Sequence, residues 1–138
     1  MDRPLVEEKL ESLRRCVERV SDKTPADVRT LQSDPDLQDI VAVNLTRAVQ
    51  LSVDIAAHLI AGLNSPAPDT MGETFDILAR HDLIPASLAE RLKQAVGFRN
   101  VAVHQYKDID WAIVHGIARN RLRDFEEFAR AVVDALGR

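Results

Sequence analysis

Residues 36 to 62 form the longest apolar segment of the chain, and this segment restricts the fold more than any other. Its apolar residues surround most of the circumference of a helix; they are Ile40, Val41, Val43, Leu45, Val49, Leu51, Val53, Ile55, Leu59 and Ile60. A helix that is apolar on nearly all sides is usually central and buried. Asp34 and Pro35 suit its start, because aspartate caps helices and proline fits the first turn. We therefore predict a helical protein built around this segment.

Helical spacing also predicts the element that precedes this segment. Over residues 4 to 22, apolar residues recur at intervals of three and four from Val6 to Val20, which is the spacing of one buried stripe. Residues 23 to 35 are rich in proline, aspartate and serine and are expected to form a connector.

Three more helices are predicted in the second half of the chain. A short helix is expected over about residues 70 to 80. Ser87 is expected to cap the next helix, with Glu90 three residues later as in a capping box. The last helix is expected to begin near Asp108 or Asp110 and to run to about Leu136.

These elements together predict the fold class. No stretch alternates convincingly as a strand, and short loops between long amphipathic helices favour antiparallel packing. We expect an all-α, antiparallel up-and-down bundle of four long helices plus one short helix, forming a single domain over residues 1–138.

Composition limits the class of protein. The chain has 138 residues, of which 46% are apolar, so it is long and apolar enough to bury a core. The net charge of -4 excludes a strongly basic nucleic-acid glove but not a local basic patch. No apolar run approaches the ~20 residues of a membrane span, and the N-terminus lacks the apolar region of a signal peptide. We expect a soluble, cytoplasmic protein without a membrane anchor.

Residues 97 to 106 carry the densest group of chemically useful side chains. Arg99, Asn100, His104 and Tyr106 fall within eight positions. A guanidinium binds phosphate well, and an imidazole transfers protons near neutral pH. This pairing fits phosphodiester chemistry.

The spacing of these residues leaves two arrangements open. Asn100 and His104 share a helix face, whereas Arg99 and His104 are five apart and lie roughly 140° apart on a straight helix. Their long side chains can still converge if the helix ends near His104, or if two copies of the motif meet across a dimer interface.

A polar stripe interrupts the apolar helix over residues 36 to 62. Asn44, Arg47, Asp54 and His58 lie on it at helical spacings. Polar groups buried without partners are costly, so this stripe meets solvent, meets another polar surface, or helps to form a site. Asp54 is the candidate partner for a cation from residues 97 to 106.

The string R-N-V-A-V-H-Q-Y, residues 99 to 106, resembles the R-x4-H-x-Y signature of the HepT-like toxins in the HEPN superfamily. Residues 73 to 106 resemble the middle portion of that family, and so does the string over residues 47 to 61. The resemblance covers most of residues 36 to 136, with no departure at the motif positions, while the N-terminal helix carries little of it.

The resemblance implies an all-α ribonuclease toxin whose homodimer brings two motifs together. It also implies a partner, a minimal-nucleotidyltransferase antitoxin encoded beside the toxin, which adenylylates the motif tyrosine, here Tyr106. A nucleotide on this side chain would block RNA by its bulk and by its negative charge.

Roles for the individual side chains follow from their chemistry together with this resemblance. His104 is expected to act as general base on a ribose 2′-hydroxyl or as general acid on the leaving oxygen. Arg99 is expected to stabilise the phosphate charge, and Asn100 to orient the phosphate or the imidazole. Tyr106 is expected to stack on a base or contact a phosphate. Asp54 is expected to orient Arg99 or His104, on side-chain type and helix phase alone.

Basic side chains near the motif are candidates for holding RNA. Lys93 and Lys107 flank it, and Arg119, Arg121 and Arg123 form a second basic cluster whose ordinary interpretation is a solvated face. The acidic balance argues against tight non-specific binding but leaves room for a structured substrate such as tRNA. The RNA substrate is left open between tRNA and mRNA.

Other classes of function stay in view. The four histidines lie in different segments without metal-ligand spacing, and no glycine-rich phosphate loop is present, so neither a metal nor a cofactor is expected. The competing hypothesis is a non-catalytic helical module that dimerises and binds a nucleotidyltransferase. A plain helical scaffold is the third.

Overall fold

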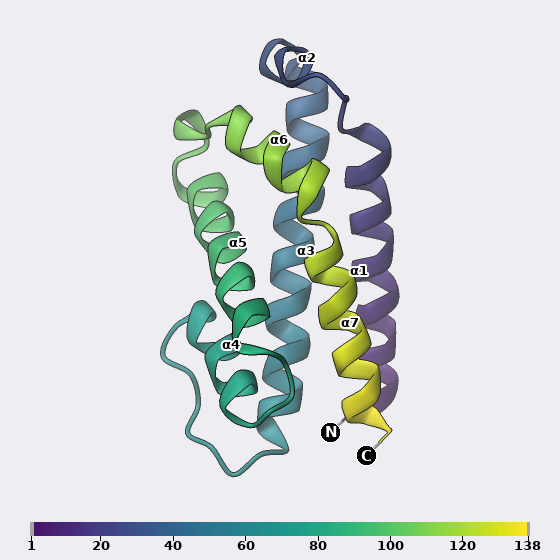
Figure 1. The fold of residues 1–138 in the computed structure, drawn as a ribbon, viewed down its shortest axis with the longest axis vertical. Coiled ribbons are helices and arrows are strands. Elements are labelled where there is room, and N and C mark those ends of the chain that lie inside the picture. Colours follow the sequence, from purple (N-terminus) through teal and green to yellow (C-terminus); the bar gives the residue numbers. More distant parts are fainter. Residues whose placement is uncertain (1, 138) are drawn as a thin grey trace.

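The computed structural model describes residues 2–137, in which α-helices and one 3-10 turn follow one another (Figure 1). The elements are α1 (Arg3–Lys23), α2 (Val28–Ser33), α3 (Pro35–Ala61), α4 (Met71–Arg80), α5 (Ala86–His104), η1 (Tyr106–Asp108), α6 (Trp111–Asn120) and α7 (Arg123–Leu136).

The long helices run up and down in sequence order. Figure 1 shows α1, α3 and α5 along the long axis of the molecule, with α6 crossing one end and α7 returning beside α1. The two chain ends lie at the same end of the bundle (Figure 1). The predicted all-α, antiparallel up-and-down bundle is therefore confirmed.

Helix starts follow the capping residues. The carboxylates of Asp2, Asp34 and Asp110 accept hydrogen bonds from backbone N–H groups in the first turns of α1, α3 and α6, and Thr70 does the same for α4. Such bonds satisfy N–H groups that have no partner inside the helix. The boundaries at these four positions are thus set locally.

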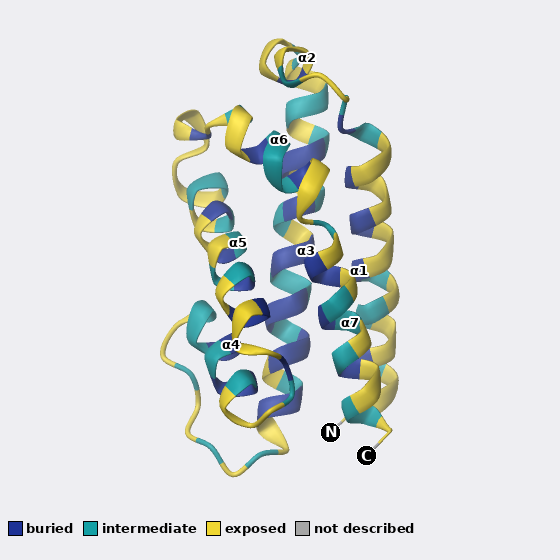
Figure 2. Ribbon diagram, viewed as in Figure 1, coloured by how far each residue is buried: buried dark blue, intermediate teal, exposed yellow. Residues whose placement is uncertain are grey.

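The central helix is α3, as the apolar pattern predicts. Figure 2 shows buried residues along most of its length, and eleven of its side chains are buried: Val41, Ala42, Leu45, Ala48, Val49, Ser52, Val53, Ile55, Ala56, Leu59 and Ile60. By length and composition alone α3 could cross a membrane. Its burial by α1, α4 and α5 is that of a bundle core.

Three predictions of helix boundaries are wrong, and they concern the connector over residues 23 to 35, the start of α5 and the last helix. Local pattern is overridden there by tertiary contacts. The connector over residues 23 to 35 contains α2, whose Leu31 is fully buried. Helix α5 begins at Ala86 after Pro85, without a side-chain cap, so Ser87 and Glu90 form no capping box.

The predicted last helix is two helices. It breaks at Arg121 and Leu122, where α6 ends and α7 begins. Helix α6 packs on α2 and α3, and His115 in it bonds through Nε2 to the carbonyl oxygen of Pro25 at 2.8 Å. Helix α7 instead packs on α1 and α5. One straight helix would not reach both sets of neighbours.

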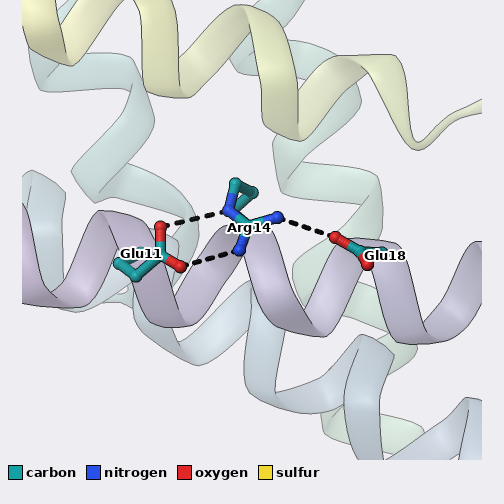
Figure 3. A network of polar contacts seen from close by, with 3 residues as sticks. All are labelled: Glu11, Arg14 and Glu18. Carbon is teal, nitrogen blue, oxygen red and sulfur yellow. Dashed lines mark hydrogen bonds and ion pairs between the residues drawn. The ribbon is translucent and has the colours of Figure 1, made fainter.

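The exposed face of α1 carries its own charge network. Arg14 donates hydrogen bonds to Glu11 on one side and to Glu18 on the other, at 2.7–3.0 Å (Figure 3). These contacts raise the pKa of Arg14 and lower that of Glu11. Because all three side chains are exposed, the network is the solvated surface of α1 rather than a site.

Candidate active site

The motif occupies the end of α5 and the turn that follows. Helix α5 is continuous to its last residue, His104, and Gln105 caps it before η1 begins. Residues 103 to 108 are all exposed, so this corner of the bundle faces outward (Figure 2). On a continuous helix Arg99 and His104 project roughly 140° apart. No hydrogen bond joins the two side chains within residues 2–137, and the helix phase directs them to different sides of α5.

Arg99 is half-buried and makes few contacts with other residues of the protomer. Its Nη1 donates to the side-chain oxygen of the neighbouring Asn100 at 3.1 Å, while its buried Nε has no hydrogen-bond partner. Across residues 2–137 no carboxylate lies within ion-pair distance of Arg99. A guanidinium with uncompensated charge and unused N–H groups is suited to an anion such as a phosphate.

His104 and Asn100 lie one turn apart on the exposed side of α5. In the described structure the imidazole makes no hydrogen bond to another residue, so both ring nitrogens are open to a ligand. This is the geometry that a proton-transfer group needs if its partner is to arrive from outside the protomer.

Tyr106 is fixed at both ends. Its hydroxyl donates a short hydrogen bond to the carboxylate of Asp39 in α3. Its ring packs edge-on against Trp111, with ring centroids 5.9 Å apart and an interplanar angle of 68°. Burial raises the pKa of Tyr106, and the hydrogen bond to Asp39 raises it further, to about 12. The phenol therefore stays protonated at neutral pH in a defined position, with 42% of the residue exposed.

Asp39 is the residue of this site that sequence reasoning missed. It lies 67 positions from Tyr106 in sequence, so no local spacing connects the two. A weak signal existed, because Asp39 is an exposed carboxylate in the second turn of a largely apolar helix. It shares its stripe with the exposed residues Val43 and Arg47, four and eight positions later.

The family assignment rests on a match over nearly the whole chain. The family model described as "Ribonuclease HepT-like" matches residues 9–132. The chain belongs to this family. The family and the ribonuclease class that the motif predicts are thereby confirmed, and the chain is a HepT-like ribonuclease.

Individual relatives agree with this assignment. The mRNA nuclease HepT of Shewanella oneidensis is 34% identical over 120 residues, which cover 87% of this chain and 90% of the relative. The tRNA nuclease HepT of Aphanizomenon flos-aquae is 31% identical over 74 residues, covering 53% of this chain and 50% of the relative. The tri-AMPylated HEPN toxin of Shewanella oneidensis, solved in complex with an MNT antitoxin, is 32% identical with a TM-score of 0.87, covering 98% of this chain and 99% of that chain.

In this HepT-like chain Asp54 does not take its predicted place. Its carboxylate accepts a hydrogen bond from Gln50 at 2.9 Å and lies 3.7 Å from the ammonium of Lys9 in α1. The helical phase that suggested a link to Arg99 instead turns Asp54 toward α1. We therefore assign Asp54 to the α1–α3 contact and correct its expected role at Arg99 or His104.

The basic side chains also divide. Lys93 forms an ion pair with Asp76 of α4 at 3.2 Å, so it ties α4 to α5 rather than flanking the motif as a free cation. Lys107 is exposed in η1. Of the arginines near the break between α6 and α7, Arg121 lines a groove beside α5 and Arg119 lines a groove beside α1. Arg123 is exposed at the start of α7.

The larger groove runs beside the motif, not through it. It has a volume of about 550 Å³ and lies between α5, the turn before α6, and the start of α7. Its walls include Ala95, Phe98 and Val101 from α5 and Ile113 and Ile117 from α6. Arg99 and His104 are not among its lining residues. The catalytic candidates therefore lie on an open corner of the protomer and do not line this groove.

Proposed function

We propose that this HepT-like ribonuclease is the toxin of a toxin–antitoxin pair, that it acts in the cytoplasm, and that it cleaves RNA without a metal ion. Residues 1–138 would act as one domain, and two copies would meet at the ends of α5. The observation that carries the proposal is the state of the motif. Arg99 has no carboxylate partner in the described chain, and His104 is exposed at the end of the same helix.

The homodimer follows from the divergence of these two side chains. One protomer holds Arg99 and His104 on different sides of α5, so a phosphate that contacts both needs a second copy of the motif. A two-fold axis near the end of α5 would place the Arg99 of one protomer opposite the His104 of the other. Val103, which is 49% exposed, lies between them in sequence and offers apolar surface for this contact.

The reaction would be transfer within the RNA chain. The imidazole of His104 would remove the proton from a ribose 2′-hydroxyl as the 2′-oxygen forms a bond to phosphorus. The bond from phosphorus to the 5′-oxygen would break, and the imidazolium formed by that proton transfer would protonate the 5′-oxygen. Arg99 would stabilise the charge on the phosphate, and Asn100 would orient the phosphate or the imidazole. The products would be a 2′,3′-cyclic phosphate and a 5′-hydroxyl end.

Control of this activity is proposed to lie at Tyr106. The Shewanella relative was solved tri-AMPylated and with an MNT antitoxin. By analogy, a nucleotidyltransferase antitoxin would adenylylate the Tyr106 hydroxyl, which is exposed on the turn next to His104. The added nucleotide would obstruct the site and repel RNA phosphates.

Growth arrest and RNA cleavage test the proposal together. The wild type, Arg99→Ala and His104→Ala would be expressed from an inducible promoter without an antitoxin, and total RNA and tRNA would be examined from each culture. We expect the wild type alone to arrest growth, and the purified variants to cleave RNA about 100-fold or more slowly. Cleavage by the wild type should persist in EDTA and should spare DNA.

Matched substitutions control for loss of a surface charge. His81→Ala and Arg130→Ala remove exposed side chains of the same types, far from the motif in sequence, and should keep wild-type activity. If Arg99→Ala and His104→Ala cleave as fast as these controls, or if the wild type leaves RNA intact, the catalytic assignment fails. The non-catalytic module that dimerises and binds a nucleotidyltransferase would then be the better description.

A further inference from the structure

The hydroxyl of Tyr106 and the carboxylate of Asp39 form a contact that RNA cleavage does not use. The phenol belongs to η1 and the carboxylate to the second turn of α3, and the hydroxyl donates directly to Oδ1 of Asp39. Both residues are exposed, and 42% of Tyr106 is accessible, so this contact lies at the surface of the protomer, where another protein can reach it.

We propose that Asp39 is the base that accepts the phenolic proton when Tyr106 is adenylylated. The inference rests on the proposed control of this ribonuclease by a nucleotidyltransferase antitoxin. ATP is the co-reactant. A bond forms between Oη of Tyr106 and the α-phosphorus of ATP, the bond from that phosphorus to the oxygen bridging to the β-phosphate breaks, and pyrophosphate leaves. The proton on Oη passes to Oδ1 of Asp39.

A base in contact is needed because the phenol is a poor nucleophile while it holds its proton. The same burial and hydrogen bond that raise the pKa of Tyr106 to about 12 keep that proton on the oxygen at neutral pH. A carboxylate already hydrogen-bonded to the hydroxyl can take the proton as the bond to phosphorus forms, without any movement of the chain.

Two other carboxylates lie near Tyr106 in sequence. Asp108 makes no hydrogen bond to the hydroxyl, which donates to Asp39. Asp110 accepts hydrogen bonds from the backbone of Ala112 and Ile113 and so serves as the cap of α6. Asp39 has no ion-pair partner among residues 2–137, so its charge is not committed elsewhere. The edge-on contact with Trp111 fixes the ring, which keeps the hydroxyl directed at this carboxylate.

The test measures the initial rate of adenylylation of the full chain. Purified wild type, Asp39→Asn, Asp39→Ala and Tyr106→Phe would be incubated with the nucleotidyltransferase encoded beside this chain, magnesium and labelled ATP. Modification at residue 106 would be followed by mass spectrometry. Asp36→Asn is the matched control, because Asp36 is another exposed aspartate at the start of α3, three positions earlier. Circular dichroism would verify that every variant is folded.

The asparagine variant separates a base from a residue that only positions the phenol. The side-chain oxygen of asparagine still accepts the hydrogen bond from Tyr106 but does not take the proton. We expect Asp39→Asn and Asp39→Ala to lose about 100-fold in rate alike. Asp36→Asn should match the wild type, and Tyr106→Phe should stay unlabelled.

Two failures can be told apart. If the wild type is modified and Asp39→Asn is modified at the same rate, Asp39 is not the base, and the proposed control through Tyr106 survives. If the wild type is not modified at Tyr106 at all, the proposed control fails and the role of Asp39 fails with it.

Discussion

The side chains of the motif are held in opposite ways. Arg99 and His104 have almost no partners inside the described chain, whereas Tyr106 is tied through its hydroxyl to Asp39 and through its ring to Trp111. Groups that act on a substrate must keep their hydrogen-bonding capacity free for it. A group that is to be modified must instead be presented to another protein in one place. The difference in bonding therefore matches the two proposed roles.

The ionisation of Tyr106 gives a direct prediction at this scale. Tyr106 is the sole tyrosine of the chain, so the ultraviolet absorbance of tyrosinate reports this side chain alone. We expect the folded protein to titrate with a midpoint of about 12, well above the ordinary tyrosine value of about 10. Because folding favours the protonated phenol, its stabilising effect is complete below about pH 10 and is lost as the pH rises through the folded pKa.

The contribution of Asp39 to that shift can be separated. Asp39→Asn should lower the midpoint but leave it above the ordinary value, because burial is the larger cause and remains. The titration is interpreted only over the pH range in which circular dichroism shows that the helices persist. A folded wild type that titrates near 10 would contradict the described contact.

At the scale of the helices, one ion pair fixes where α7 begins. Nε of Arg91 in α5 donates to Asp124 in the first turn of α7 at 2.8 Å, and Nη2 donates to Glu127 at 3.2 Å. The side chain of Asp124 is only 7% exposed, so its charge depends on Arg91. This pair ties the helix that carries the motif to the helix that closes the bundle.

Arg91→Met should therefore destabilise the fold. It leaves the buried carboxylate of Asp124 without a counter-charge, and the free energy of unfolding should fall by about 1–3 kcal/mol, less than for a fully buried pair because Arg91 is itself partly exposed. Chemical denaturation followed by circular dichroism measures this. Glu127→Gln is the control and should change stability by less than about 0.5 kcal/mol, because the Glu127 side chain is 42% exposed, whereas that of Asp124 is 7% exposed. Equal effects of the two substitutions would contradict the structural role of Asp124.

Substitution of Gly97 is expected to stabilise the fold, whereas Arg91→Met is expected to destabilise it. Gly97 lies inside α5, and a Cβ atom built there meets no atom within 4 Å. Glycine costs a helix roughly 0.5–1 kcal/mol relative to alanine, so Gly97→Ala should raise the free energy of unfolding by about that amount. Thermal unfolding should show an increase in Tm of roughly 2–4 °C. Gly116→Ala in α6 is the companion case, with equally open space. A lower Tm for Gly97→Ala would mean that the surface over it is covered in solution.

The element scale also shows what the sequence can predict. Helices whose starts depend on a local cap, such as Asp34 for α3, were predicted within a residue or two because the cap and the apolar pattern agree. The break at Arg121 and Leu122 was missed, because residues 111–136 keep a helical apolar pattern through it. The break accompanies a change of neighbours, because α6 packs on α2 whereas α7 packs on α5, and that information lies in distant residues.

The same distinction applies to the site. Arg99, Asn100, His104 and Tyr106 were found because they are neighbours in sequence and resemble a known signature. Asp39 was missed and Asp54 misplaced, because helix phase gives the side of α3 on which a residue lies but not which helix covers that side. Only the packed bundle shows that Asp39 meets η1 and that Asp54 meets α1.

At the scale of the whole molecule, binding of RNA is expected to depend more on the number of copies of the chain in the assembly than on the net charge. The chain carries -4 overall, so its affinity for RNA depends on where its cations gather. Within one protomer Lys93 is paired with Asp76, while Arg119 and Arg121 line different grooves. A second copy would double the basic groups at the ends of α5 and would supply the imidazole that faces each Arg99.

This arrangement predicts that two inactive variants restore activity when mixed. If each site takes Arg99 from one protomer and His104 from the other, a dimer of Arg99→Ala with His104→Ala keeps one intact site of its two. After free exchange of subunits, mixed dimers make up half of the population, so the mixture should recover about a quarter of the wild-type rate of RNA cleavage. The exchange would be carried out by dilution and reconcentration, with the dimer mass verified by light scattering. Two controls give the background rate of RNA cleavage. In one, His104→Ala is mixed with itself, and in the other it is mixed with wild-type chain that has been denatured. If the mixture stays as inactive as either variant although mixed dimers are present, Arg99 and His104 act within one protomer, and the end of α5 must rearrange to bring them together.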